Sequence, residues 1–170
     1  MLGFGQEDNF IVAGTGHRPK YCPCRYKKNH PWLNNLKGRL KTYLSGINMM
    51  ARGDIIVRAG GAIGWDTWLA ETALHLGFEL HLYLPFPDQG KNWPSDSREE
   101  YEIIKGRADK VNFTAEEYYP KVFFDRDRQM IEGSDQVVSL LNPEARSGGT
   151  FYTVGEAEKL EIPVINFWKE

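Results

Sequence analysis

The stretch RAGGAIGWDTWLAETAL, residues 58–74, places the end of a strand, a glycine-rich turn and the start of a helix in direct succession. The run DIIVRAG at 54–60 has the composition of a buried strand, and WDTWLAETALHLG at 65–77 has the spacing of a helix that ends near Gly77. Glycines between a strand and a helix either permit a tight turn or let a ligand approach the backbone. Both interpretations stay open on this stretch alone.

The same alternation of apolar runs and helical patterns continues along the whole chain. The other expected strands are 10–14, 78–86, 109–113, 136–141 and 162–168, and the other expected helices are 32–51, 97–108, 119–133 and 148–161. Such alternation predicts an α/β fold, Rossmann-like and doubly wound, with a mainly parallel sheet. The chain shows no internal repeat and no linker, so we expect one domain over residues 1–170, with residues 1–9 as an N-terminal extension.

Composition and charge narrow the class of protein. The chain has 170 residues, of which 41% are hydrophobic and 26% charged, as in ordinary globular domains. Its formal charge of −2 and pI of about 6.1 give no global attraction to nucleic acids or anionic membranes. The first nine residues are too short and too acidic for a signal peptide, and no apolar run is long enough for a membrane helix. We therefore expect a cytoplasmic protein.

Two cysteines, Cys22 and Cys24, raise the question of a metal. Together with His17 and His30 they could form a ligand set, HRPKYCPCRYKKNH. However, the C-x-C spacing is not that of zinc fingers, and no second cysteine pair follows. We expect a loop that contains two thiols, and no metal.

Two strand ends carry glycine-rich loops that lead directly into helices: GGAIGWD at 60–66 and NPEARSGGT at 142–150. Backbone N–H groups at the start of a helix, with no Cβ in the way, can bind an anion such as phosphate. Neither loop is a P-loop, because no GK[ST] follows, and neither matches the dinucleotide GxGxxG fingerprint. The structural alternatives are tight packing at the first loop and a flexible loop with Thr150 as the helix cap at the second.

Five ordered motifs together resemble a known family. They are GTGHRP (14–19), GGAIGWDTWLAETAL (60–74), the pattern Pro85, Gln89, Trp93, then RDRQMIEGSD (126–135) and SGGTFYTVGEAEK (147–159). In this order they are similar to the YpsA-like branch of the SLOG superfamily, which also includes the DprA and LOG proteins. The resemblance spans about residues 11–168. It implies a Rossmann-like fold and a pocket for a nucleotide or a nucleotide-derived ligand.

The resemblance to LOG enzymes also bears on catalysis. These enzymes hydrolyse the N-glycosidic bond of nucleoside monophosphates with an arginine and a glutamate, and their arginine matches Arg126 here. Their glutamate position is occupied by Thr153. Glu156 follows almost one helical turn later and Glu71 is another acid, so both are candidate catalytic residues besides Arg126.

Three functions follow as hypotheses. The first is a non-catalytic binder of a nucleotide or an ADP-ribose-like ligand, acting as a sensor or a sequestering protein. The second is an N-glycosidic-bond hydrolase or transferase. The third, DprA-like binding of single-stranded DNA, is disfavoured by the acidic pI. We expect no required cofactor, a small nucleotide ligand and a homo-oligomer, the last as implied by the resemblance.

The expected ligand-binding residues come from four loops and include two residues of a possible lid at 85–97. They are Gly14, Thr15, Gly16, Arg18, Gly60, Gly61, Ala62, Gly64, Asp66, Gln89, Trp93, Gly148, Gly149 and Thr150. Asp66 has a structural alternative as an N-cap or a first-turn acid that counters the helix dipole.

Overall fold

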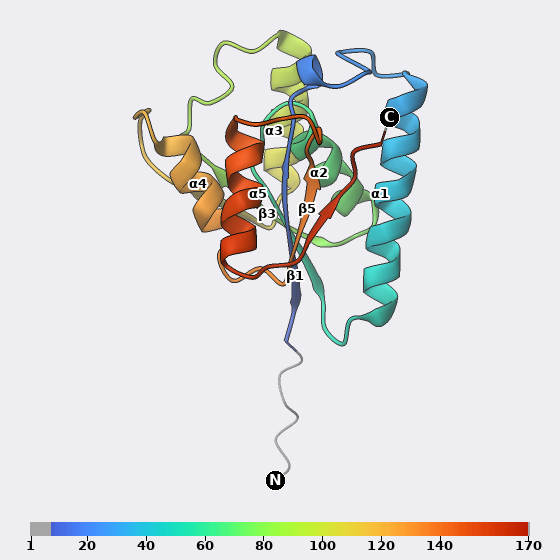
Figure 1. Ribbon diagram of the computed structural model, residues 1–170. Helices are drawn as coiled ribbons and strands as arrows, with labels where there is room; N and C mark the ends of the chain where they lie inside the picture. Colours follow the sequence, from blue (N-terminus) through green and yellow to red (C-terminus); the bar gives the residue numbers. More distant parts are fainter. Residues whose placement is uncertain (1–7, 170) are drawn as a thin grey trace.

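The computed structural model describes residues 8–169 and consists of one layered α/β unit (Figure 1). The strands are β1 (Phe10–Gly16), β2 (Ile55–Ala59), β3 (Glu79–Leu84), β4 (Lys110–Phe113), β5 (Gln136–Leu140) and β6 (Val164–Asn166). The helices are the short 3-10 helix η1 (Pro19–Tyr21), then α1 (Pro31–Met50), α2 (Trp65–His75), α3 (Ser95–Arg107), α4 (Val122–Ile131) and α5 (Gly149–Lys159). All eleven expected strands and helices are present. At most of their ends, the observed bounds differ from the expected ones by a few residues. The N-terminal extension expected at residues 1–9 lies, up to residue 7, outside the described residues.

The six strands form one sheet in the order β4-β3-β2-β1-β5-β6, and every pairing is parallel. This confirms the expected α/β class. The chain moves outward from β1 to β4 on one side and then returns to place β5 on the other side of β1. In such sheets ligands bind at the carboxyl ends of the strands where the winding direction reverses. Here that point lies between β1 and β5.

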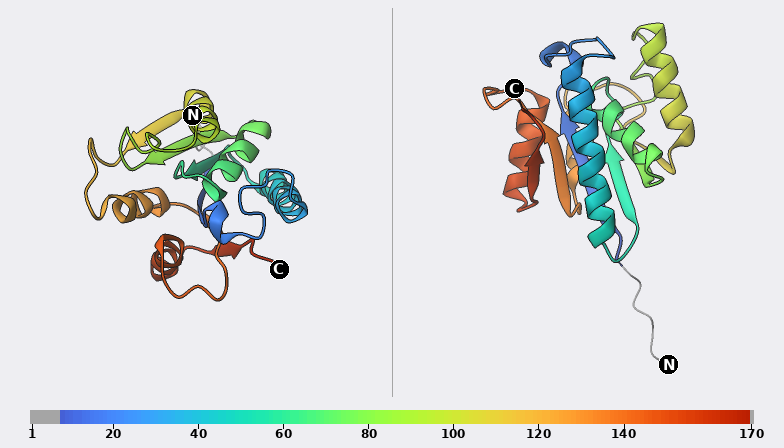
Figure 2. Two further views of the ribbon diagram at one scale, coloured as in Figure 1. Left: turned by 90° about the horizontal axis from the view of Figure 1, so that it is seen from above. Right: turned by 90° about the vertical axis from the view of Figure 1, so that its right-hand side faces the viewer.

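Helices cover both faces of the sheet (Figure 2). One face carries α1, α2 and α3 over the larger core, to which β1 contributes Val12 and β2 Val57. The other face carries α4 and α5 over a smaller core that includes Ala13, Met130 and Ala157. Val12 and Ala13 point to opposite faces because side chains alternate along a strand. No helix among residues 8–169 is both long and apolar enough to cross a membrane.

The helix starts follow local sequence signals. Pro31 occupies the first turn of α1, and the ring of His30 accepts a hydrogen bond from the N–H of Trp32 at 3.2 Å. Helix α2 begins after Gly64, whose φ of +104° is a conformation that favours glycine. Gly77, with φ of +73°, follows the end of α2 as expected.

Gly16 at the end of β1 gives a first testable prediction. A Cβ at this position would lie 2.3 Å from Cγ of Trp65, a fully buried indole at the start of α2. Gly16→Ala is expected to lower the free energy of unfolding by about 1–3 kcal/mol, because a rigid buried ring cannot move away.

Urea denaturation measures this loss. Gly38 in α1 provides the control, since a Cβ there meets no atom within 4 Å, and Gly38→Ala is expected to raise stability by about 0.5–1 kcal/mol. Equal effects of the two substitutions would contradict the packing described for β1 and α2.

Candidate ligand-binding site

A cavity of about 650 Å³ opens at the carboxyl edge of the sheet, where the winding reverses between β1 and β5. Its walls come from the end of β1 and the segment after it, the loop before α2 and the first turn of α2, the inner face of α4, and the loop that joins β5 to α5. Ten of the expected site residues line it: Gly14, Thr15, Gly16, Arg18, Ala62, Asp66, Arg126, Gly148, Gly149 and Thr150. The two segments farthest apart in sequence, 14–18 and 142–150, therefore meet at one site.

The start of α5 forms one wall of this cavity. Gly148 has φ of +101°, and the first hydrogen bond into the helix runs from the N–H of Tyr152 to the carbonyl of Gly148 at 3.0 Å. The N–H groups of the first turn before Tyr152 have no place in the helical hydrogen-bond pattern. They carry the positive end of the helix dipole, so this wall favours an anion.

The segment after β1 is tied to the same loop through His17. The N–H of His17 donates to the carbonyl of Leu140 at 3.1 Å, and the N–H of Asn142 donates to Nε2 of His17 at 3.0 Å. Burial lowers the pKa of His17, which agrees with a neutral ring that accepts this hydrogen bond at Nε2. His17 thereby fixes the distance between the two walls.

Arg126 lies at the base of the cavity. It is buried, its Nε donates to Oδ1 of Asp127 at 2.6 Å, and its Nη1 donates to the carbonyl of Gly60 and, at 3.3 Å, to that of Tyr83. The hydroxyl of Thr153 lies 2.9 Å from Oδ2 of Asp127 and can donate to it. The side chain that occupies the LOG glutamate position thus supports the arginine through Asp127.

Asp66 is buried close to Arg126 and Asp127, and their charges act on its carboxyl group. Burial raises its pKa to about 6, against an ordinary value of 3.8, and the nearby Asp127 adds to the rise, while Arg126 and Arg18 oppose it. Oδ2 of Asp66 accepts a hydrogen bond from the N–H of Ala62 at 3.1 Å. A carboxyl group in this state can hold or release a proton near neutral pH.

The first glycine-rich loop, 60–66, is therefore filled by the protein's own groups. A Cβ on Gly60 would lie 2.6 Å from Nη1 of Arg126, so the glycine permits the close approach of the arginine. Gly61 has φ of +71° and packs against Leu84, and Gly64 packs against Pro19. These three glycines serve packing, and the N–H of Ala62 is already paired with Asp66.

Four other expected residues lie outside the cavity. Nε2 of Gln89 donates to the carbonyl of Gly61 at 3.1 Å, and the ring of Trp93 packs edge-on against Tyr101 of α3. Glu71 pairs with Lys37 of α1 at 3.5 Å, beside Glu100. Glu156 pairs with Lys159 at 2.7 Å, and this hydrogen bond lowers its pKa.

Basic side chains surround the opening of the cavity. Arg18, Lys20 and Arg146 line it and are exposed, and within residues 8–169 none of them has a carboxylate within 4 Å. Glu144 is the one exposed acid among the lining residues of this part of the chain. The opening thus offers guanidinium and ammonium groups that can pair with phosphate.

The cysteines and histidines do not converge. Cys22 and Cys24 are buried in the larger core, and burial raises the pKa of the Cys22 thiol to about 12. His30 caps α1. Over residues 8–169 no three His, Cys, Asp or Glu side chains lie close enough to hold a metal ion.

Sequence reasoning missed Asp127, His17 and Arg146. A signal for Asp127 was present in the sequence: the apolar pairs 122–123 and 130–131 recur at helical spacing, and Arg126 and Asp127 lie midway between them on the same face, where both are buried. Charged residues at core positions of an amphipathic helix indicate a buried ion pair or a site. His17 lies within the motif GTGHRP and Arg146 within the loop 142–150, but their roles depend on the meeting of these two distant loops, which sequence spacing does not reveal.

Comparison with known proteins shows to which family this chain is similar. The YpsA family model, described as the YspA SLOG family, matches residues 12–164. A UPF0398 protein of Bacillus cereus is 30% identical over 156 residues, which cover 88% of this chain and 83% of the relative. A UPF0398 protein of Bacillus thuringiensis is 28% identical over the same length and coverage.

Solved structures show the same fold in DNA processing protein A. The Helicobacter pylori protein, studied for its single-stranded DNA binding mode, superposes with a TM-score of 0.62 at 19% identity. The Streptococcus pneumoniae protein gives a TM-score of 0.62 at 15% identity. Each match covers 92% of this chain, but only 64% and 50% of the respective neighbours. At these identities the likeness concerns the fold.

Proposed function

The chain belongs to the YspA SLOG family, and on this premise we propose that it binds a nucleotide or an ADP-ribose-like derivative through a phosphate at the start of α5. The observation that carries the proposal is the cavity at the winding reversal, where the N-terminus of α5 and three exposed basic side chains line one opening. Fixed N–H donors and guanidinium groups together bind phosphate more strongly than either alone. Such a protein would act as a sensor or would sequester its ligand.

Titration calorimetry of the full chain tests this binding. The ligands are AMP, GMP, ADP and ADP-ribose. Adenosine and inorganic phosphate are tested as parts of these ligands, and a single-stranded oligonucleotide is tested as a representative nucleic acid. We expect the phosphorylated ligands to bind and adenosine to bind much more weakly, since the phosphate supplies the main contacts. Equal affinity for adenosine and AMP would contradict the phosphate site.

The oligonucleotide belongs in this test because the comparisons give no support to the expectation against nucleic acids. Single-stranded DNA binding is a property of the Helicobacter pylori neighbour. If this chain bound an oligonucleotide with a strong salt dependence and no nucleotide, the small-ligand proposal would be wrong.

A second candidate function is hydrolysis of a nucleotide N-glycosidic bond. The observation in its favour is Asp66, a cavity-lining carboxyl group whose pKa of about 6 suits proton transfer. Hydrolysis breaks the bond between the base nitrogen and the anomeric carbon, adds the hydroxyl of water to the sugar and gives a proton to the leaving base. Arg126 lies at the base of the same cavity, whereas Glu71 and Glu156 lie outside it.

Incubation with nucleoside monophosphates and chromatography for free base tests this candidate. Asp66→Asn should abolish the release, while the matched substitutions Glu71→Gln and Glu156→Gln should leave it unchanged. Release that persists in Asp66→Asn would exclude Asp66 as the acid, and no release by the unmodified chain would leave binding as its function.

A further inference from the structure

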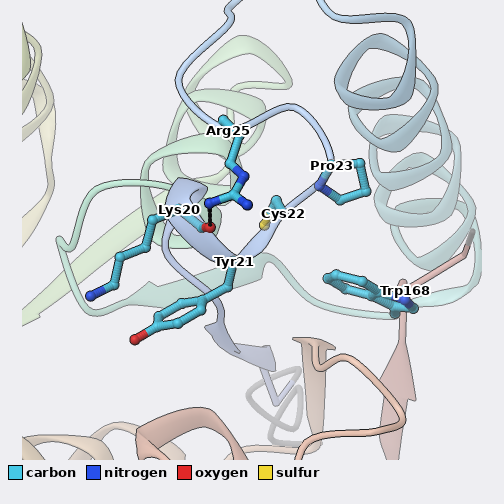
Figure 3. A pocket seen from close by; sticks show the side chains of 6 residues that line it. All are labelled: Lys20, Tyr21, Cys22, Pro23, Arg25 and Trp168. Atoms are coloured by element: carbon cyan, nitrogen blue, oxygen red, sulfur yellow. Dashed lines mark hydrogen bonds between the residues drawn. The ribbon is translucent and has the colours of Figure 1, made fainter.

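A second cavity, of about 550 Å³, adjoins the first one at the 3-10 helix η1. Its lining residues are Lys20, Tyr21, Cys22, Pro23, Arg25 and Trp168, and Lys20 and Tyr21 also line the larger cavity. Figure 3 shows the rings of Tyr21 and Trp168, which come from opposite ends of the chain, at one side of this space, with Pro23 and Arg25 across from them. The two cavities therefore share a wall.

The ring of His17 lies between the two cavities. The ring of His17, which lines the larger cavity, lies 5.8 Å from that of Tyr21 and 5.9 Å from that of Trp168 between centroids. Trp168 is in turn held edge-on against Trp32 of α1. The shared wall is thus rigid on its inner side, since His17 is also hydrogen-bonded to the N–H of Asn142.

The outer side of the second cavity carries charge and an open ring. Tyr21 is 59% exposed, and Nζ of Lys20 lies 4.7 Å from the centroid of its ring. Nη1 of Arg25 donates to the carbonyl of Lys20 at 2.6 Å, which holds the segment in place (Figure 3). An exposed aromatic face beside cations can stack a base and pair with an adjoining phosphate.

We propose that Tyr21, Lys20 and Trp168 form a second subsite, which takes the distal ring of a ligand whose phosphate bridge starts at α5. The ligand class is then a pyrophosphate-linked dinucleotide, with two ring-bearing halves, rather than a mononucleotide. This inference rests on the proposed nucleotide site. One half occupies the larger cavity, the bridge passes Lys20, and the second ring lies against Tyr21.

Calorimetry on matched ligands tests the second subsite. AMP is compared with diadenosine diphosphate, and GMP with diguanosine diphosphate, so that each pair shares one half. In at least one of the two pairs, we expect the dinucleotide to bind about tenfold more tightly than the mononucleotide, because one further base stacks on the protein. Tyr21→Ala should lower this ratio of affinities about tenfold, and the matched control Tyr26→Ala, at 66% exposure in the same loop, should not change it.

The outcomes separate the two proposals. If no nucleotide of either pair binds, the nucleotide site itself is wrong, and the subsite falls with it. If mononucleotides bind but the ratio stays near one, or if Tyr21→Ala lowers both affinities equally, the second subsite is wrong and the nucleotide site stands. If Tyr21→Ala weakens only an oligonucleotide, this wall binds a nucleic acid strand, which also overturns the dinucleotide proposal.

Discussion

Replacing Arg126 with leucine is expected to lower the free energy of unfolding by about 3–5 kcal/mol, the cost of leaving buried charges without their partner. Nε of the arginine lies 2.6 Å from Oδ1 of Asp127, and its Nη1 donates to two backbone carbonyls. Its positive charge also stabilises the ionised form of Asp66. Leucine supplies none of these contacts, and both carboxylates stay buried. Urea denaturation at pH 7 measures the loss.

Arg128→Leu is the matched control, because Arg128 lies on the exposed side of the same helix. It should change stability by no more than about 0.5 kcal/mol. Adding Asp127→Asn to Arg126→Leu should restore part of the loss, since one buried charge is then removed. Equal stabilities of the two single variants would contradict the buried charge cluster.

Asp66→Asn is expected to stabilise the protein at neutral pH, although it removes a carboxyl group from the site. The pKa of Asp66 is about 6 in the folded chain and 3.8 ordinarily, so the folded state binds the proton more tightly. The wild-type protein therefore loses stability as the pH rises from about 4 to above 6, by up to about 3 kcal/mol. Asparagine cannot ionise, and it keeps an acceptor for the N–H of Ala62.

The stability difference between Asp66→Asn and the wild type, measured by denaturation from pH 4 to pH 8, should thus grow with pH. Asp88→Asn on the exposed loop after β3 serves as the control and should show no comparable growth. A variant that is less stable than the wild type at pH 8, or a difference independent of pH, would contradict the assignment of a raised pKa to burial.

The fold could be predicted from the sequence because its signals are local. Unbroken apolar runs such as 136–141 indicate strands buried on both faces, and the helical patterns between them leave little choice of topology. Boundaries differ where packing overrides pattern. The third strand, expected over 78–86, spans Glu79–Leu84, and the helix expected over 119–133 is reduced to Val122–Ile131.

The site could be predicted only in part. The sequence assigned residues of several strand-end loops to one site, and the meeting of 14–18 with 142–150 follows from the position of β1 beside β5. What spacing could not reveal is the occupant of each loop: two glycine-rich loops look alike in sequence, yet Arg126 and Asp66 fill the one at 60–66. Glu156 follows Thr153 by nearly one helical turn, which suggested that it could replace the missing glutamate. Its side chain lies outside the cavity and pairs with Lys159.

Several expectations stay predictions. They are the homo-oligomer, the cytoplasmic location, the absence of a required cofactor and the catalytic use of Arg126. Size-exclusion chromatography with light scattering tests the first directly.

The measurement that tests the account most directly is calorimetric binding of a phosphorylated nucleotide to Gly149→Val. Gly149 lines the cavity at the first turn of α5, and a Cβ there meets no protein atom within 4 Å, so the added side chain enters the space assigned to the phosphate. Gly155→Val, in the same helix and with the same open surroundings, is the control. We predict an affinity at least about tenfold lower for Gly149→Val than for Gly155→Val. Equal affinities of these two folded variants would contradict the phosphate site at α5.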